Sequence, residues 1–181
     1  MKTPAPLTMI TTTEPPPAAK TGAAMNRGTS KQDFATPPNF REAVCRRFGF
    51  PSVDLAAHAG NYFGKGFIGP AENSLLVPWA VENPITDEPL FWLNPPFANI
   101  APWAKKCAEV NATTGARILF LTPASVGSEW FDRYVHRKAM VLGLVGRIAF
   151  DPLHPSWGYP KDCILSCYGY GVGFDTWDWR D

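Results

Sequence analysis

Several features are absent from this chain of 181 residues, and each absence excludes a class of protein. No apolar run approaches the roughly 20 residues that a membrane-spanning helix needs. The N-terminus has no apolar segment followed by a cleavage site, so we expect no secretory signal. The formal net charge is only +1, so a nucleic-acid partner would have to be held by a local basic patch. These absences predict a cytoplasmic protein without membrane contact.

Cysteine is scarce and dispersed along the chain. Only four cysteines occur, and no two of them form a C-x-x-C pair. Without a secretory signal they are expected to stay reduced. Cys163 and Cys167 lie four residues apart, but a metal site would need further ligands nearby. We therefore expect free thiols in a strand and no metal ion.

Proline, with 19 residues, and aromatic side chains, at 13%, are abundant. The first 33 residues are rich in Pro, Ala and Thr and have few large apolar side chains. Such a stretch cannot bury enough surface to offset its ordering entropy. We therefore predict a disordered tail over residues 1–33 and one folded domain over residues 34–181. The tail has a net charge of +2 and could touch a polyanion, although an inert leader is the simpler interpretation.

Helices are predicted where apolar residues recur at helical spacing. Phe40, Val44 and Phe48 share one helical face, and Thr36 is the expected N-cap before a first turn that contains proline. Two further helices are predicted over residues 100–110 and 128–138. Ser128 is the expected N-cap of the second of these.

Short apolar runs between the helices predict buried strands. They span residues 90–93, 117–123, 140–145 and 164–168, and a further short strand within the run 51–57 ends at Asp54. The intervening residues 58–74 contain four glycines and are predicted to be a loop. Strands that alternate with helices indicate an α/β fold with a parallel sheet flanked by helices. Ligands bind such sheets at the carboxyl ends of the strands, where we expect Asp54, Asn94 and Thr122.

The segment Asn94-Pro95-Pro96-Phe97 directly follows the predicted strand 90–93 and is the most informative motif of the chain. Its two prolines cannot continue a β-ladder, and each restricts the residue before it to extended geometry. The turn is therefore rigid, and it presents an amide, backbone carbonyls and an aromatic ring. A flat group that bears an amine fits such a turn, with Phe97 as a stacking surface.

Methylation of an amine is the chemistry that this turn could support. The exocyclic amine of a base is a poor nucleophile because its lone pair is delocalised into the ring. Acceptors on its two N–H groups, such as the Asn94 side-chain oxygen and the Pro95 carbonyl, can pull the nitrogen toward tetrahedral geometry. A sulfonium methyl donor held in line then allows direct displacement. The base must first leave the duplex.

Further short motifs occur in a fixed order along the chain. They are Thr36-Pro37-Pro38, Val53-Asp54-Leu55-Ala56-Ala57, Trp103 after the proline turn, Leu121-Thr122-Pro123-Ala124 and Gly146-Arg147-Ile148-Ala149-Phe150. Through these motifs and Asn94–Phe97, most of residues 34–170 resembles the DNA N6-adenine methyltransferases encoded by phages, which are small Dam-like enzymes. The resemblance implies a Rossmann-like single domain that uses S-adenosylmethionine to methylate a flipped adenine, site-specifically, in double-stranded DNA.

The resemblance also implies roles for individual residues. Four would lie along the cofactor: Thr36, Pro37, Asp54 and Ala56. Three would hold the adenine: Asn94, Pro95 and Phe97. Glu72, the nearest acid for the ribose hydroxyls, and its neutral neighbour Asn73 are further cofactor candidates. In a family of phage enzymes, one expected role is the protection of phage DNA from restriction.

The chain departs from the usual pattern in the loop after Asp54. A Gly-x-Gly is expected there, but the run from Asp54 to Gly60 offers only Gly60. No separate recognition domain is visible, so any sequence reading must come from loops such as residues 146–162. That loop combines charge with aromatic surface in Arg147, His154, Trp157, Tyr159 and Lys161. His58 could approach the cofactor, although a plain loop histidine is the simpler interpretation.

Other functions stay open on the sequence alone. An Asn-Pro-Pro-Phe turn also serves enzymes that methylate guanine N2 in RNA or a glutamine amide in proteins. A catalytically degenerate, nucleic-acid-binding form of the fold is a third alternative, because the Gly-x-Gly is missing. Methylation at cytosine C5 is disfavoured because no Pro-Cys occurs. Enzymes acting on cytosine N4 usually carry Ser at the position of Asn94.

Overall fold

The computed structural model describes residues 35–79, 89–150 and 158–181. The predicted tail, residues 1–33, lies outside the described residues. The helices are α1 (Pro38–Phe48), α2 (Ala101–Thr114) and α3 (Glu129–Tyr134). The strands are β1 (Val53–Asp54), β2 (Gly66–Phe67), β3 (Leu90–Leu93), β4 (Arg117–Pro123), β5 (Met140–Leu144), β6 (Cys163–Tyr168) and β7 (Gly173–Trp177).

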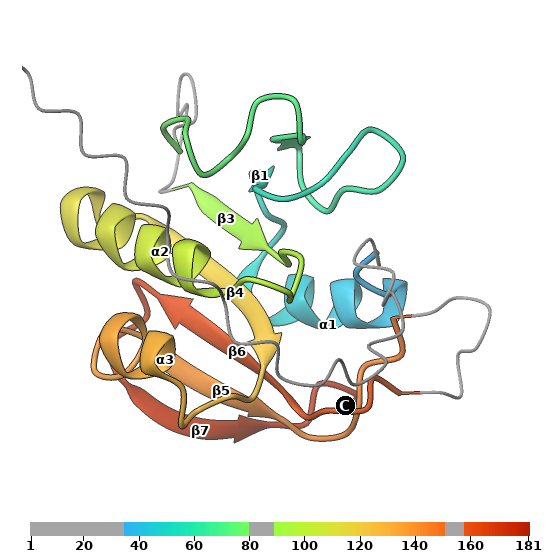
Figure 1. Cartoon of the computed structure of the whole chain (residues 1–181). Helices are drawn as coiled ribbons and strands as arrows, with labels where there is room; N and C mark the ends of the chain where they lie inside the picture. Colours follow the sequence, from blue (N-terminus) through green and yellow to red (C-terminus); the bar gives the residue numbers. More distant parts are fainter. Residues whose placement is uncertain (1–34, 80–88, 151–157) are drawn as a thin grey trace, which may run out of the picture. The chain divides into compact units, whose positions relative to one another are not determined.

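The seven strands found among the described residues form one sheet in the order β2-β1-β3-β4-β6-β5-β7 (Figure 1). The neighbouring strands β2 and β1, β1 and β3, and β3 and β4 are parallel. Strand β6, in contrast, runs antiparallel to both of its neighbours, β4 and β5. The predicted all-parallel sheet is therefore wrong in this half. Parallel neighbours need a crossover, usually a helix, and the structure describes no helix between β5 and β6 in residues 145–150 and 158–162.

Helices cover both faces of the sheet, as the alternation of strands and helices predicts. On one face, α1 packs Phe40, Ala43 and Val44 into a core cluster with β4 and β6 side chains. On the other face, α2 contributes Ala104 and Cys107 to a second cluster, against which α3 packs. Both faces of β4 are thereby buried, which explains its continuous apolar sequence.

Three predicted element boundaries are wrong. Thr36 does not cap α1, because the N-cap is Pro37, whose extended ψ of 146° follows from the proline at position 38. The third helix ends at Tyr134 instead of residue 138, although its Ser128 cap is confirmed, with Oγ accepting from Phe131 N. The second helix continues to Thr114, where Gly115 ends it in a left-handed conformation.

Two strands are missed by the sequence analysis. β2 is two residues long and lies in the stretch predicted as a loop. β7 is an exposed edge strand, so it has no apolar alternation to reveal it. Cys163 and Cys167 lie in β6 as free thiols.

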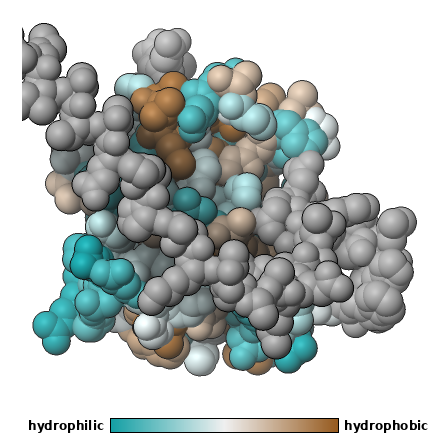
Figure 2. Space-filling view, viewed as in Figure 1, coloured by the Kyte–Doolittle hydropathy of each residue, from teal (hydrophilic) through white to brown (hydrophobic). Residues whose placement is uncertain are grey.

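Apolar and polar side chains are interspersed on the face shown in Figure 2. Among the described residues the most exposed large apolar side chains are Leu76, Phe174 and Val172. They belong to separate segments, the turn after β2 and the β7 edge. Exposed apolar side chains at single positions are common in soluble proteins and need no special explanation.

Candidate functional site

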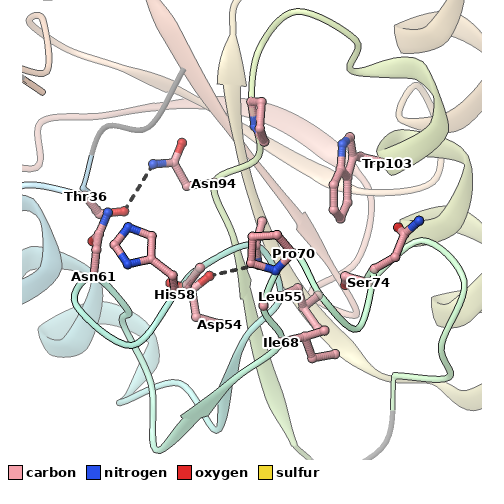
Figure 3. A pocket seen from close by; sticks show the side chains of 15 residues that line it. Thr36, Asp54, Leu55, His58, Asn61, Ile68, Pro70, Ser74, Asn94 and Trp103 are labelled. Atoms are coloured by element: carbon pink, nitrogen blue, oxygen red, sulfur yellow. Dashed lines mark hydrogen bonds between the residues drawn. The ribbon is translucent and has the colours of Figure 1, made fainter. Parts of the chain in front are cut away.

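A pocket opens at the carboxyl ends of β1 and β3, at the edge of the sheet where the sequence predicts ligand binding. It is lined mainly by the segments that follow β1, β2 and β3, together with residue 36 and one side chain of α2 (Figure 3). The lining residues are Thr36, Asp54, Leu55, Ala56, Ala57, His58, Asn61, Ile68, Gly69, Pro70, Asn73, Ser74, Asn94, Pro96 and Trp103.

Asn94 lies at this pocket because β3 stops at Leu93 and two prolines follow. Its side chain is half-buried, and Nδ2 donates to Thr36 Oγ1 at 3.4 Å. Thr36 is only 4% exposed, so this contact lies inside the protein. Residues 58 positions apart in sequence thus form one wall of the pocket (Figure 3).

Asp54 is a buried acid at the floor of the pocket. Its Oδ1 accepts from Ala56 N at 3.2 Å and its Oδ2 from Phe63 N at 2.9 Å. Burial raises the pKa of this carboxyl to about 6, although both amide hydrogen bonds and the nearby Arg41 oppose the rise. The carboxyl thereby holds together the loop that lacks the expected Gly-x-Gly.

The predicted cofactor residues divide into two groups. Thr36, Asp54, Ala56 and Asn73 line the pocket. Pro37 and Glu72 do not. Pro37 is the N-cap of α1. Glu72 is exposed, and its Oε2 accepts from Gly69 N at 3.0 Å, so it closes the turn beside the pocket.

The aromatic ring of the proline turn lies beside the pocket rather than in its lining. Phe97 is half-buried and packs edge-to-face against Phe150 and Tyr159, with ring centroids 6.1 and 5.6 Å away. Pro95 is buried, whereas the neighbouring Pro96 lines the pocket. The proline turn thereby contacts the connection between β5 and β6, on both sides of its undescribed residues.

Several pocket residues were not predicted as site residues. His58 lines the pocket, where it could approach a cofactor, and its Nδ1 accepts from Gly60 N. Asn61 and Trp103 line it as well. Trp103 follows the proline turn on the first turn of α2, a position that could have indicated it. Nothing in the sequence around Asn61 indicates a site.

Arg41 supports the pocket from behind without lining it. Its guanidinium donates from Nε to Thr36 O at 2.6 Å, from Nη1 to Tyr62 O at 3.0 Å and from Nη2 to Asn61 Oδ1 at 3.2 Å. Burial lowers the pKa of Arg41, and Asp54 opposes that change. One side chain of α1 therefore joins two segments of the pocket wall.

A second cation fastens the segment beyond β2. Lys106 donates from Nζ to Ser74 O at 2.7 Å and to Val77 O at 2.5 Å, and it lies 5.0 Å from the centre of the Trp79 ring. Trp79 Nε1 also donates to Ser74 O. Lys106 therefore binds the segment that contains Ser74 and Val77, of which Ser74 lines the pocket. Lys105, in contrast, is exposed and pairs with Glu109.

The loop of residues 146–162, which is predicted to recognise the DNA sequence, is described only in part. Its residues His154 and Trp157 lie outside the described residues. Arg147 and Lys161 are exposed and line a shallow groove beyond the end of β4. Tyr159 instead packs against Phe97. Within the described ranges, no group of three or more His, Cys, Asp or Glu side chains could hold a metal ion. No described helix is long and apolar enough to cross a membrane.

The described residues form a mixed α/β domain with a pocket at the carboxyl edge of its sheet. The sequence model of one protein family, described as DNA N-6-adenine-methyltransferase (Dam), matches residues 25–160. This match covers more than half of the chain, so the chain belongs to that family and the resemblance is confirmed. It favours adenine in DNA over the RNA and protein alternatives. No curated protein and no solved structure matches the chain.

Proposed function

We propose that this protein transfers a methyl group from S-adenosylmethionine to N6 of adenine at specific sites in double-stranded DNA, on a Rossmann-like fold. The observation that carries the proposal is the position of Asn94, which lies at the carboxyl end of β3 in one pocket with Thr36 and Asp54. The family match supplies the reaction class.

The pocket fits S-adenosylmethionine in its chemistry. Apolar side chains of Leu55, Ile68 and Trp103 suit the adenine ring of the cofactor, and polar groups such as Asn73 and Ser74 suit its ribose and amino acid ends. The buried carboxyl of Asp54 suits its positive charge, because a nearby cation favours the ionised carboxylate that burial disfavours. When bound, S-adenosylmethionine supplies an activated methyl group on a sulfonium centre.

Two acceptors of the chain act on the target amine. The Asn94 side-chain oxygen and the Pro95 carbonyl accept its two N–H groups, which localises the lone pair on nitrogen. Orientation supplies most of the rate, and no strong base is required, because the amine proton can leave after the methyl group is attached. Phe97, supported by Phe150 and Tyr159, offers the ring on which the flipped base stacks.

The decisive experiment incubates the full chain with labelled S-adenosylmethionine and unmethylated double-stranded DNA, followed by digestion to nucleosides. We expect label in N6-methyladenine, and a loss of at least about 100-fold in rate for Asn94→Ala. Asn99→Ala is the matched control, because Asn99 is an exposed amide of the same segment that does not line the pocket. Equal losses in both variants would contradict a specific role for Asn94.

The alternatives give different outcomes in parallel reactions. Label in guanine of RNA or in a protein glutamine would overturn the DNA assignment. Calorimetry that detects no S-adenosylmethionine binding, with or without DNA, would support the degenerate, DNA-binding form instead.

A further inference from the structure

Arg41, Thr36 and Asn94 form a chain of hydrogen bonds from α1 to the proline turn. Arg41 Nε donates to the Thr36 carbonyl at 2.6 Å, and the Thr36 hydroxyl accepts from Asn94 Nδ2 at 3.4 Å. Thr36 is buried, so its own backbone has little freedom once Arg41 holds it. The amide of Asn94 is therefore connected to α1 through two hydrogen bonds, one from Asn94 to Thr36 and one from Arg41 to Thr36.

The direction of this contact matters for chemistry. The amide nitrogen of Asn94 donates to Thr36, and the amide oxygen, on the opposite side of the side-chain carbon, points away from Thr36 (Figure 3). The reverse orientation would also keep a hydrogen bond, because the Thr36 hydroxyl can donate to an amide oxygen. The contact with Thr36 therefore fixes the position of the amide, and the two N–H groups of an incoming amine select the orientation of its ends. Only the first orientation offers an acceptor rather than a donor to an amine on the far side of the amide.

Arg41 binds Thr36 and does not line the pocket, so its role is to position other residues. Its guanidinium bonds to three groups of two segments, and its Cζ lies 5.6 Å from the centre of the Phe63 ring. These contacts use the planar fork of an arginine, which the ammonium group of a lysine cannot reproduce. The same fork also places Asn61 on the pocket wall.

We propose that Thr36 and Arg41 are positioning residues that hold the Asn94 amide in place for methyl transfer. The inference rests on the proposed function and adds to it, because the resemblance places Thr36 along the cofactor only. A residue that contacts the cofactor mainly affects its KM. A residue that positions Asn94 mainly affects kcat, since a displacement of about 1 Å can cost on the order of 100-fold in rate.

The kinetic test compares four variants of the full chain at saturating DNA. Thr36→Val removes the hydroxyl and is expected to lower kcat at least about tenfold, with the KM for S-adenosylmethionine changed less than threefold. Thr36→Ser keeps the hydroxyl and should restore kcat to within about threefold of the original. Arg41→Lys should resemble Thr36→Val, whereas Arg46→Gln, an exposed residue of the same helix, should leave kcat unchanged.

A second measurement does not depend on activity. The side-chain amide signals of Asn94 in a ¹⁵N–¹H spectrum can be assigned by their absence in Asn94→Ala. Thr36→Val should shift them, and Thr36→Ser should not. If the original chain transfers no methyl group to DNA, the proposed function fails, and these signals still test the contact. If Thr36→Val raises only the KM, or leaves the Asn94 signals in place, the inference is overturned.

Discussion

Asp54 shows how burial and hydrogen bonding act on one carboxyl group. Two backbone amides donate to it, which favours the ionised form, yet burial outweighs them and raises its pKa to about 6. Because the folded-state pKa exceeds the unfolded value near 3.9, the folded protein binds this proton more tightly. Its stabilising contribution is complete below about pH 3, under the unfolded pKa, and is lost as the pH rises through about 6.

We therefore predict that the free energy of unfolding falls by on the order of 2 kcal/mol more between pH 4 and pH 7 in the original chain than in Asp54→Asn. The substitution removes the titration, although it also replaces one acceptor by a donor and lowers stability at every pH. Urea unfolding across this pH range measures the difference in slope. Parallel pH profiles for the two proteins would show that Asp54 does not titrate there.

Gly64 is a position where a side chain has no room. A Cβ there would lie 3.1 Å from Asp54 N and from Gly66 O, both of them backbone atoms that cannot move independently. Gly64→Ala is expected to lower the free energy of unfolding by about 1–3 kcal/mol. Gly66→Ala is the control, since a Cβ there meets nothing within 4 Å, and it should change stability by less than about 1 kcal/mol. Chemical denaturation of both variants compares them directly.

At the scale of elements, α2 holds the segment beyond β2 through one lysine. Lys106→Met keeps the alkyl stem but removes two hydrogen bonds from a charged group to carbonyls, so we expect a loss of about 1–3 kcal/mol. Lys105→Met removes only an exposed pair at 3.6 Å with Glu109 and should cost less than about 0.5 kcal/mol. Amide hydrogen exchange of residues 74–79 should accelerate in the first variant alone. Equal free energies of unfolding for Lys106→Met and the original chain would contradict this prediction. They would show that water satisfies the carbonyls of Ser74 and Val77 equally well when Lys106 is absent.

The sequence predicts the elements that bury apolar side chains and misses those that do not. β3, β4 and β6 have continuous apolar runs because helices cover both faces of the sheet. β2 and β7 lie at the two edges of the sheet and have mostly exposed side chains, so no apolar pattern marks them. The antiparallel direction of β6 depends on a connection whose path no local pattern encodes.

The same reasoning explains what is predicted of the candidate site. Asp54 and Asn94 could be predicted because each follows a recognisable strand, and parallel strands bring such ends together. Arg41 and Asn61 could not, because their contacts join residues 20 positions apart that share no motif. Long-range pairs of this kind become visible only when the fold is known.

At the scale of the whole molecule, the family match begins at residue 25, inside the stretch predicted as a tail. We expect a chain that starts at residue 25 to keep the melting temperature of the full chain within about 2 °C, because the preceding residues have few large apolar side chains. A second variant that starts at residue 34 tests the predicted domain boundary. Thermal unfolding followed by circular dichroism measures both. A decrease of more than about 4 °C for the first variant would contradict the tail prediction.

β6 lies between β4 and β5 although it follows both in the sequence. On the ribosome, β4 and β5 are therefore made before the strand that pairs with their facing edges. Each edge presents unpaired N–H and C=O groups, which are sites of aggregation. At about 5–20 residues per second, translating the chain from the end of β5 to the end of β6 takes roughly one to five seconds. A translational pause between these two strands would lengthen the interval in which the newly made chain can pair wrongly.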